Sequence, residues 1–231
     1  MEYIVLVTEK QVKAIGYIEN DFKEKFGIPR QSGKADGVVS RVYFYPPYGA
    51  EEAFKGLDGF SHVWLLFDFS AAQTTEFHAT VRPPRLGGNT RVGVFASRSP
   101  FRPNGIGLSV VRLLSVDKTE DGVCLTVGGA DLLNGTPILD VKPYLPHADC
   151  IEGAVGGYAD KVAEKRLTVR FAEGLQAKIP LDKLAGLTDC LAEDPRPSYQ
   201  DEPSRVYGMA FGDYNVKFQV QDGVLTVLTI E

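Results

Sequence analysis

The sequence has few of the residues that build metal sites and disulfide frameworks. Its 231 residues include only three cysteines, Cys124, Cys150 and Cys190, which lie far apart and form no Cys-x-x-Cys pair. Its three histidines likewise lack a metal-binding spacing such as His-Glu-x-x-His. The sequence therefore predicts no metal site, and it predicts cysteines that serve as small buried hydrophobic residues.

Long apolar runs and a signal segment are also missing. The longest apolar stretches, such as Val63 to Phe67, fall far short of the ~20 residues needed to cross a bilayer. The N-terminus lacks a basic segment followed by a long apolar one. We therefore expect a soluble cytoplasmic protein with no membrane partner.

Acidic residues are absent from one long segment of an otherwise acidic chain. The formal net charge is -5, which argues against nonspecific coating of nucleic acid. Between Glu76 and Asp117, however, there is no acidic residue. The arginines in that stretch are Arg82, Arg85, Arg91, Arg98, Arg102 and Arg112. Such a segment can attract a phosphate chain or an anionic ligand, and solvated or ion-paired arginines are the alternative.

Short β-rich segments dominate the first part of the chain. They mix β-branched, aromatic and apolar residues, and Gly, Pro or Asp occupies the gaps between them. These segments are residues 14–18, 37–45, 61–69, 91–95, 108–116 and 123–127. The pattern predicts a mainly β protein with a closed or nearly closed β-barrel, and one short helix around residues 51–55.

A second set of elements follows Pro146. Residues 167–171 have the pattern of a strand, and Pro180 opens a helix that runs from Leu181 to about Leu191. Further strands are predicted at residues 205–211, 214–220 and 223–230, the last two joined by an Asp-Gly hairpin turn. We therefore expect a β-barrel domain over residues 1–152 and a small α+β C-terminal domain over residues 153–231.

Residues 81–107 have the composition of a rigid ligand-binding loop. Prolines stiffen the backbone, glycines allow it to approach a ligand closely, and arginines supply planar forks for carboxylate, phosphate or base. No Walker loop and no Gly-x-Gly-x-x-Gly turn between a strand and a helix is present. The sequence thus indicates an anion-binding loop outside the usual nucleotide-binding folds.

Two further segments carry unusual polar residues. Residues 129–144 contain an Asn-Gly turn and place Asp131, Asp140 and Lys142 among apolar residues, where charges are costly unless paired or functional. A turn-capping role for Asp131 is the alternative. The segment from Asp194 to Tyr199 holds an arginine and an aromatic on a proline-stiffened loop, which suits either RNA binding or a simple helix stop.

At these segments the sequence resembles the bacterial TrmO, or TsaA-like, tRNA methyltransferases. The resemblance spans nearly the full chain and rests on Lys23 to Gln31, Phe60 to Phe67, Val81 to Gly107, Asp131 to Tyr144, Asp194 to Tyr199 and Asp213 to Lys217. It implies an S-adenosylmethionine-binding β-barrel methyltransferase that works as a homodimer. It further implies methylation of N6 of N6-threonylcarbamoyladenosine at position 37, next to the anticodon of threonine tRNA.

The resemblance also assigns donor-binding residues. They are Pro29, Arg30, Gln31, Ser70, Ala71, Arg98, Leu108, Gly129, Ala130 and Asp131, with Asn134, Gly135, Thr136 and Pro137 supporting the turn. This chain has Ser70-Ala71 where the family often has His-Gln, and Asn134 where it often has Asp. The donor site is thus expected to draw on loops that are far apart in the sequence.

The acceptor side is expected to be basic. The threonyl carboxylate and the neighbouring phosphates are anions, which Arg82, Arg85, Arg91, Arg102 and Arg196 would bind. A sulfonium donor carries an activated methyl group, so the transfer needs mainly alignment of donor and acceptor. The acceptor nitrogen is amide-like, so a base would help by about 10²–10⁴-fold. The candidates for base or orienting group are Tyr199, Asp194 and Asp140.

Two other functions fit some of these residues. One is a non-catalytic RNA-binding barrel, and the other is a methyltransferase that uses S-adenosylmethionine on a small molecule. The arginine-rich segment favours RNA, and the embedded polar turn favours a catalyst. The central hypothesis is that the arginine-bearing loop and the Asn-Gly turn together enclose the donor and present positive charge to an anticodon arm.

Overall fold

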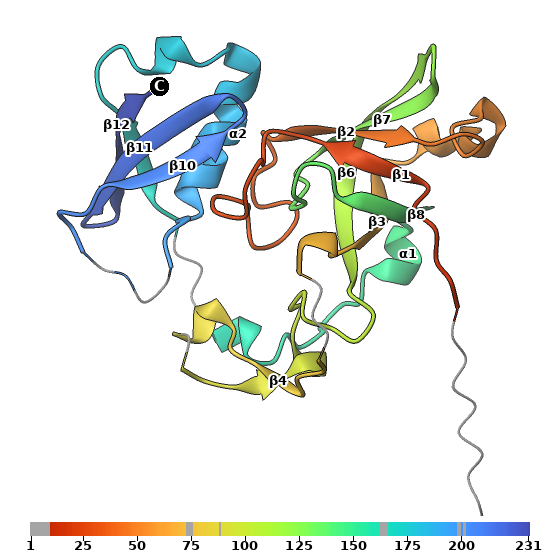
Figure 1. Ribbon diagram of the computed structural model, residues 1–231, viewed down its shortest axis with the longest axis horizontal. Coiled ribbons are helices and arrows are strands. Elements are labelled where there is room, and N and C mark those ends of the chain that lie inside the picture. Colours follow the sequence, from red (N-terminus) through yellow and green to blue (C-terminus); the bar gives the residue numbers. More distant parts are fainter. Residues whose placement is uncertain (1–9, 73–75, 88, 162–165, 198–199, 201) are drawn as a thin grey trace, which may run out of the picture.

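Six antiparallel strands close into a barrel in the computed structural model, which describes residues 10–72, 76–87, 89–161, 166–197, 200 and 202–231. In barrel order the strands are β1 (Gly16–Glu19), β2 (Val39–Phe44), β7 (Gly122–Gly128), β6 (Ile106–Thr119), β3 (His62–Asp68) and β8 (Pro137–Pro143). Figure 1 shows the barrel on one side of the molecule and the C-terminal elements on the other. The mainly β fold with a barrel, expected from the sequence, is confirmed.

The barrel interior is filled by alternating residues of its strands. In β3, Val63, Leu65 and Phe67 are buried, whereas the residues between them lie toward the outside. Because side chains in a strand alternate between its two faces, this period-two pattern gives one apolar face per strand. These inward faces form one continuous core inside the barrel.

Three long connections leave the barrel at the same end. The last residue of β3, Asp68, lies opposite the first residue of β6, and the last residue of β7, Gly128, lies opposite Val39 at the start of β2. Likewise Tyr17 of β1 pairs with Pro137, the first residue of β8. The connections 20–38, 69–105 and 129–136 therefore emerge side by side, although they are far apart in the sequence.

The 69–105 connection holds a small sheet of its own. Its strands β4 (Thr80–Val81) and β5 (Val92–Gly93) pair with each other and not with the barrel. Figure 1 shows this segment, in yellow, below the barrel. Its 3-10 helices are Ser70–Ala72, Pro84–Leu86 and Val94–Ala96.

The C-terminal elements form a four-stranded sheet backed by a helix. The sheet order is β10 (Tyr207–Phe211), β11 (Tyr214–Gln221), β12 (Val224–Ile230) and β9 (Thr168–Phe171), and the helix is α2 (Leu181–Ala192). The remaining elements are the short α1 (Pro146–Asp149) and the 3-10 helices Glu51–Phe54, Leu57–Gly59, Ala159–Lys161 and Gln176–Lys178. Within the described residues, no helix is both long and apolar enough to span a membrane.

The connection between β1 and β2 packs into the core of the C-terminal elements. Phe22, Ala35 and Val38 belong to the same buried cluster as Leu187, Cys190 and the strand residues of that sheet (a set that also includes Met209 and Phe218). Burial of apolar surface stabilises by roughly 25 cal/mol per Å², so this shared core holds the connection against the helix. The position of residues 20–38 therefore depends on both parts of the chain.

Polar contacts also join the 20–38 connection to α2. Asp189 of α2 accepts a hydrogen bond from the Gly37 N–H at 3.0 Å, and Lys183 is ion-paired with Asp21. A Cβ added at Gly186 would lie 2.8 Å from the Gly37 carbonyl oxygen, so the helix and the loop touch backbone to backbone. Glycine is needed at this crossing because no side chain fits between the two backbones.

Two strands and one helix differ from the expectation. Strand β8 was not predicted, because Asp140, Lys142 and two prolines interrupt its apolar pattern, and prolines are tolerated at the ends of a strand. Residues 91–95 were predicted as a strand, but only Val92–Gly93 is extended, and a 3-10 helix follows at once. The predicted helix at residues 51–55 is a single 3-10 turn, Glu51–Phe54.

Candidate functional site

The 20–38 connection and the turn 129–136 are bonded to each other at the open end of the barrel. The Gly33 N–H donates to the Gly129 carbonyl oxygen at 2.9 Å, and the Asn20 N–H donates to the side-chain oxygen of Asn134 at 3.0 Å. Gly129 has a φ of 74°, and a Cβ there would lie 2.8 Å from a carboxylate oxygen of Asp36. The loop is thus held by the backbone of Gly129 and by the side chain of Asn134, which opens the supporting turn that continues through Gly135, Thr136 and Pro137.

A cluster of polar side chains joins these loops to the 69–105 connection. Arg98 donates to the Gln31 side-chain oxygen at 2.7 Å, and the Ser109 hydroxyl donates to Asp131 at 2.6 Å. Burial raises the pKa of the Asp131 carboxyl, and the hydrogen bond from Ser109 and the charge of Arg98 oppose only part of that shift. A half-buried carboxylate of this kind gains stability when a cation binds beside it.

The other donor-binding candidates lie around this cluster to different degrees. Ser70 and Ala71 form the 3-10 turn after β3, and Lys25 donates to the Ala71 carbonyl oxygen at 2.7 Å, which ties this turn to the 20–38 loop. Pro29 and Ala130 are buried, whereas Arg30 is exposed. Leu108 is 50% exposed on the outer face of β6, opposite Leu66, so its side chain points away from the barrel interior.

The catalytic candidates do not converge on one point. Tyr199 lies outside the described residues. Both carboxylate oxygens of Asp194 accept from the Arg196 guanidinium, at 2.8 and 2.9 Å, and Asp194 has a φ of 51°. Asp140 lies within β8 and is ion-paired with Lys142 at 3.0 Å on the barrel wall. Of the two described carboxylates, only Asp194 adjoins the 20–38 loop.

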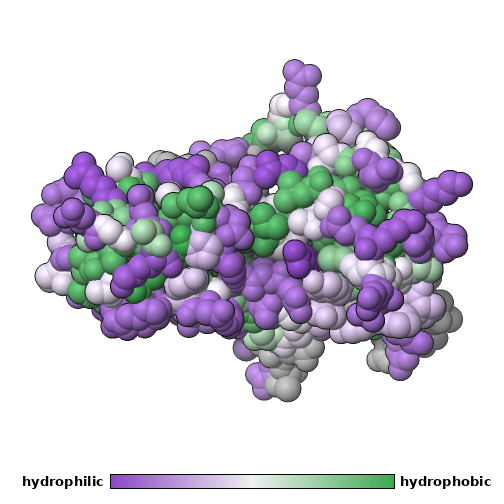
Figure 2. All heavy atoms as spheres, turned by 90° about the horizontal axis from the view of Figure 1, so that it is seen from above, coloured by the Kyte–Doolittle hydropathy of each residue, from purple (hydrophilic) through white to green (hydrophobic). Residues whose placement is uncertain are grey.

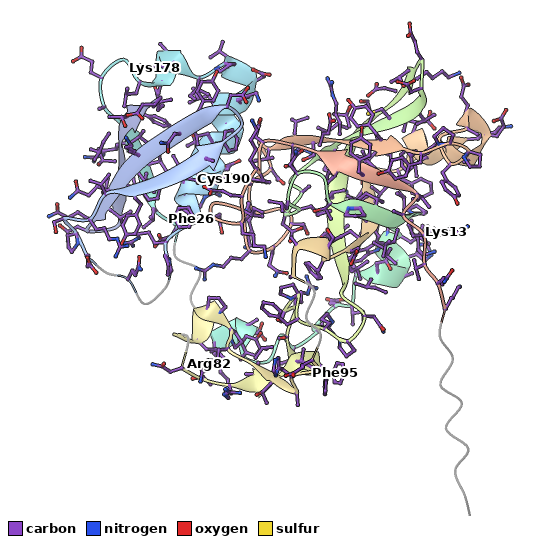
Figure 3. All side chains as sticks on the ribbon, in the orientation of Figure 1. Lys13, Phe26, Arg82, Phe95, Lys178 and Cys190 are labelled. Atoms are coloured by element: carbon purple, nitrogen blue, oxygen red, sulfur yellow. The ribbon has the colours of Figure 1, made fainter. Side chains whose placement is uncertain are left out.

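A small cavity separates that loop from the end of α2. Its volume is about 180 Å³, and Lys25 to Arg30 line one side while Cys190 and Glu193 to Pro195 line the other. Figure 3 labels Phe26 and Cys190 at this contact. Burial raises the pKa of the Cys190 thiol, so the sulfur stays protonated and serves as a small apolar surface. The cavity places Asp194 next to the donor-binding candidates Pro29 and Arg30.

A much larger cavity opens beside the 69–105 connection. Its volume is about 1640 Å³, and its basic lining residues are Arg30, Lys34, Arg82, Arg91 and Arg98, with His78 beside them. Gly156, Tyr158, Ala159 and Asp160 also line it. Figure 3 shows Arg82 and Phe95 on the segment that carries β4. Because Arg30 lines both cavities, the two lie next to each other.

The RNA-binding candidates divide into two groups. Arg82 and Arg91 line the large cavity, and Arg85 lies in the nearby 3-10 helix Pro84–Leu86. Arg102, in contrast, donates to the carbonyl oxygens of its own loop, and the Arg196 side chain is only 10% exposed in its ion pair with Asp194. These two guanidiniums thus have partners within the protein, and a direct role of Arg102 and Arg196 in binding an anion stays a prediction.

Sequence reasoning assigned no role to several residues that line the large cavity, among them one lysine and three phenylalanines. They are Lys34, Phe77, Phe95 and Phe101. The signal for the three aromatics was present in the sequence, because phenylalanines in a segment rich in Arg, Pro and Gly have no apolar periodicity to place them in a core. Figure 2 shows that hydrophobic residues also reach the surface elsewhere, so exposure alone does not mark a site.

Two family models match separate parts of the chain. Residues 17–150 match the tRNA-methyltransferase O N-terminal domain, and residues 164–231 match the TrmO C-terminal domain. The chain belongs to the tRNA-methyltransferase O family. The family resemblance inferred from the sequence is thereby confirmed, and with it the expectation of a methyltransferase.

Individual relatives of the family are similar over nearly the whole length. The tRNA (adenine(37)-N6)-methyltransferase of Escherichia coli (strain K12) is 40% identical over 96% of this chain and 97% of its own. A putative S-adenosylmethionine-dependent methyltransferase, RcsF, of Pseudomonas aeruginosa is 44% identical over 89% of this chain and 90% of its own. The crystal structure of TrmO from Pseudomonas aeruginosa has a TM-score of 0.79 at 37% identity, covering 97% of this chain and all of that one.

Among the described residues, no group of three or more His, Cys, Asp or Glu side chains lies together in a way that could hold a metal ion.

Proposed function

We propose that this chain transfers a methyl group from S-adenosylmethionine to N6 of adenosine 37 in tRNA. The observation that carries the proposal is the meeting of three barrel connections around a half-buried carboxylate, directly beside a large basic cavity. The names of the Escherichia coli and Pseudomonas aeruginosa relatives supply the donor and the acceptor position. The finer acceptor that we propose is N6-threonylcarbamoyladenosine in threonine tRNA.

The residues at the open end fit a cationic methyl donor. S-adenosylmethionine supplies an activated methyl group on a positively charged sulfonium. Asp131 offers a carboxylate that a neighbouring cation would stabilise, while Gln31 and Arg98 offer further polar atoms. No Cβ fits at Gly129, where it would lie 2.8 Å from a carboxylate oxygen of Asp36, so a glycine lets the turn pass this close to the 20–38 loop. The donor would thus be held by the turn 129–131 and the loop 29–31.

The acceptor side would use charge and position more than chemistry. Alignment of two bound reactants can contribute as much as about 7–11 kcal/mol to a rate. Arg82 and Arg91 would hold the phosphates of the anticodon arm in the large cavity. Asp194, held in the ion pair with Arg196, would orient the acceptor where the barrel domain that we propose for residues 1–152 meets the C-terminal domain that we propose for residues 153–231. Tyr199 and Asp140 remain the other candidates for the proton acceptor.

The test uses purified protein and tRNA from cells that lack this gene. We expect incorporation of a labelled methyl group into threonine tRNA, found by mass spectrometry on N6 of nucleoside 37, and micromolar or tighter binding of S-adenosylhomocysteine in calorimetry. Binding to tRNA without donor binding would leave a non-catalytic RNA-binding barrel. Donor binding without incorporation into any tRNA would leave a small-molecule methyltransferase. Light scattering checks the homodimer that belongs to the same proposal.

A matched pair of variants links the activity to the site. Arg98→Ala removes a guanidinium that contacts Gln31, whereas Arg170→Ala removes an exposed guanidinium on β9 of the C-terminal sheet. We expect Arg98→Ala to weaken donor binding and Arg170→Ala to leave it unchanged. Equal donor affinity in both variants would remove Arg98 from the proposed site.

A further inference from the structure

Three phenylalanines point to a stacking surface within the large cavity. All phenylalanines of the chain lie within the described residues, and only Phe77, Phe95 and Phe101 are largely exposed, at 60%, 73% and 45%. All three line the same basic cavity. We propose that Phe95, assisted by Phe77 and Phe101, stacks on unpaired nucleotides of the RNA. This inference rests on the proposed function and adds how the protein would bind its RNA substrate.

The turn that carries Phe95 is held rigidly. Its neighbour Val94 is 1% exposed, and the Val94 N–H donates to the Ala79 carbonyl oxygen at 2.9 Å. The Val94 carbonyl oxygen accepts from the Ser97 N–H, the Ser97 hydroxyl and the Arg102 guanidinium, at 3.2, 2.9 and 3.3 Å. Four hydrogen bonds and one buried side chain thus fix a turn whose next residue faces the cavity.

Rigid presentation matters because stacking orders the side chain. A phenylalanine that is already fixed on a tight turn loses little conformational freedom when a base covers it. Phe101 is held in a related way, since its N–H donates to the Ser99 hydroxyl at 3.2 Å. The loop therefore displays flat apolar rings at defined positions, which is the arrangement that single-stranded nucleic acid uses for stacking.

The charge of the cavity identifies the occupant as RNA. Arg82, Arg91 and Arg98 line it, and Asp160 is the acidic residue of its lining. A second copy of this chain has a formal net charge of -5, and it could occupy the cavity only if its acidic groups lay opposite those arginines. An RNA strand meets this condition along its whole length, because every nucleotide carries a phosphate. The volume of about 1640 Å³ exceeds the roughly 300–1,000 Å³ of pockets for small molecules. It leaves room for several nucleotides.

Binding of an anticodon stem-loop of threonine tRNA tests the inference. Stacking of one base on an aromatic ring corresponds to roughly 5- to 150-fold in affinity. We therefore expect Phe95→Ala to raise the dissociation constant by that factor and Phe95→Trp to restore it. The salt dependence of binding should keep its slope in Phe95→Ala, because no phosphate contact is lost, whereas Arg82→Ala should lower the slope by about 1.

Controls separate stacking from loss of structure and from other partners. Leu181→Ala removes an even more exposed apolar side chain, 88% exposed, at the start of α2 and should bind as the wild type does. Binding of S-adenosylhomocysteine should be unchanged in Phe95→Ala. Wild-type RNA affinity in Phe95→Ala would overturn the inference, and so would a change of oligomeric state in that variant by light scattering without a loss of RNA affinity.

Failure of the inference can be told apart from failure of the proposed function. If the wild-type protein neither binds nor methylates tRNA, the proposed function falls and the stacking surface falls with it. If the wild type methylates tRNA and Phe95→Ala matches its Michaelis constant and rate, only the stacking surface is refuted.

Discussion

Replacement of Asp131 by Asn isolates the charge of the half-buried carboxyl group from its shape. Asn keeps an oxygen in the position that accepts the Ser109 hydroxyl at 2.6 Å, so the turn should remain in place. The negative charge is lost. If that charge faces the cationic donor, the lost interaction has the size of a charge-assisted hydrogen bond, about 1.5–3 kcal/mol. The dissociation constant of the donor should then rise by about 10- to 150-fold.

The assay compares two ligands by calorimetry. S-adenosylmethionine carries a sulfonium, whereas S-adenosylhomocysteine does not, and both carry an amino group. A larger loss for S-adenosylmethionine would place Asp131 beside the sulfonium, and equal losses would place it beside the amino group. Unchanged affinity for both ligands in Asp131→Asn would refute the reasoning that this carboxylate binds the donor.

The same variant has an opposite effect on the stability of the ligand-free protein. Burial raises the pKa of the Asp131 carboxyl in the folded state, so folding favours its protonated form. The favourable contribution is fully present below the ordinary pKa of about 3.9 and is lost as the pH rises through the raised value. At pH 7 the wild type therefore bears the cost of a buried charge, and Asp131→Asn should melt at a higher temperature. A lower melting temperature at pH 7 would show that the charge stabilises the fold.

Three further outcomes follow from the packing of the loops. Gly186→Ala should lower the melting temperature and weaken donor binding, because the new Cβ would lie 2.8 Å from the Gly37 carbonyl oxygen. Overpacking typically costs about 1–3 kcal/mol of stability, and the higher helix propensity of alanine offsets about 1 kcal/mol of that cost. Unchanged donor affinity in calorimetry would contradict this prediction. Arg102→Ala should reduce tRNA methylation much more than donor binding, because the carbonyl oxygens of Val94 and Ser97 lose the hydrogen bonds that hold their loop. Faster hydrogen exchange of the amides in that loop is the independent readout. Arg98→Ala should act mainly by weakening donor binding. A methylation defect with normal donor affinity would refute the assignment of Arg98 to the donor site.

Much of the fold was readable from local pattern. Period-two alternation around Val63, Leu65 and Phe67 predicted β3, and Pro180 together with the apolar spacing after it predicted α2. Strand β8 was missed because its outward positions carry Asp140 and Lys142, which pair with each other across one face and look like site residues in the sequence. A strand with polar residues on its outer face and proline at both ends resembles a loop until its neighbours are known.

The site was readable only in part. The sequence singled out residues 81–107, 129–144 and 194–199, and the structure brings the first two to the same end of the barrel. It could not tell which arginines face a cavity, because Arg82 and Arg102 stand in similar sequence surroundings but one lines the cavity and the other binds its own loop. Nor could it show that Phe95 is exposed, since exposure depends on what packs over the turn.

Composition and motifs alone determined the family, the barrel and the absence of a metal-binding spacing, because each of these depends on residue patterns within short segments of the chain. The tertiary structure decided the rest. Residues 20–38, 69–105 and 129–136 meet only because antiparallel strands in the order β1-β2-β7-β6-β3-β8 turn all three connections to one end, and α2 then fixes the first of them from about 150 residues away. Strand order and register are properties of long-range pairing, and no local pattern encodes which distant segments become neighbours.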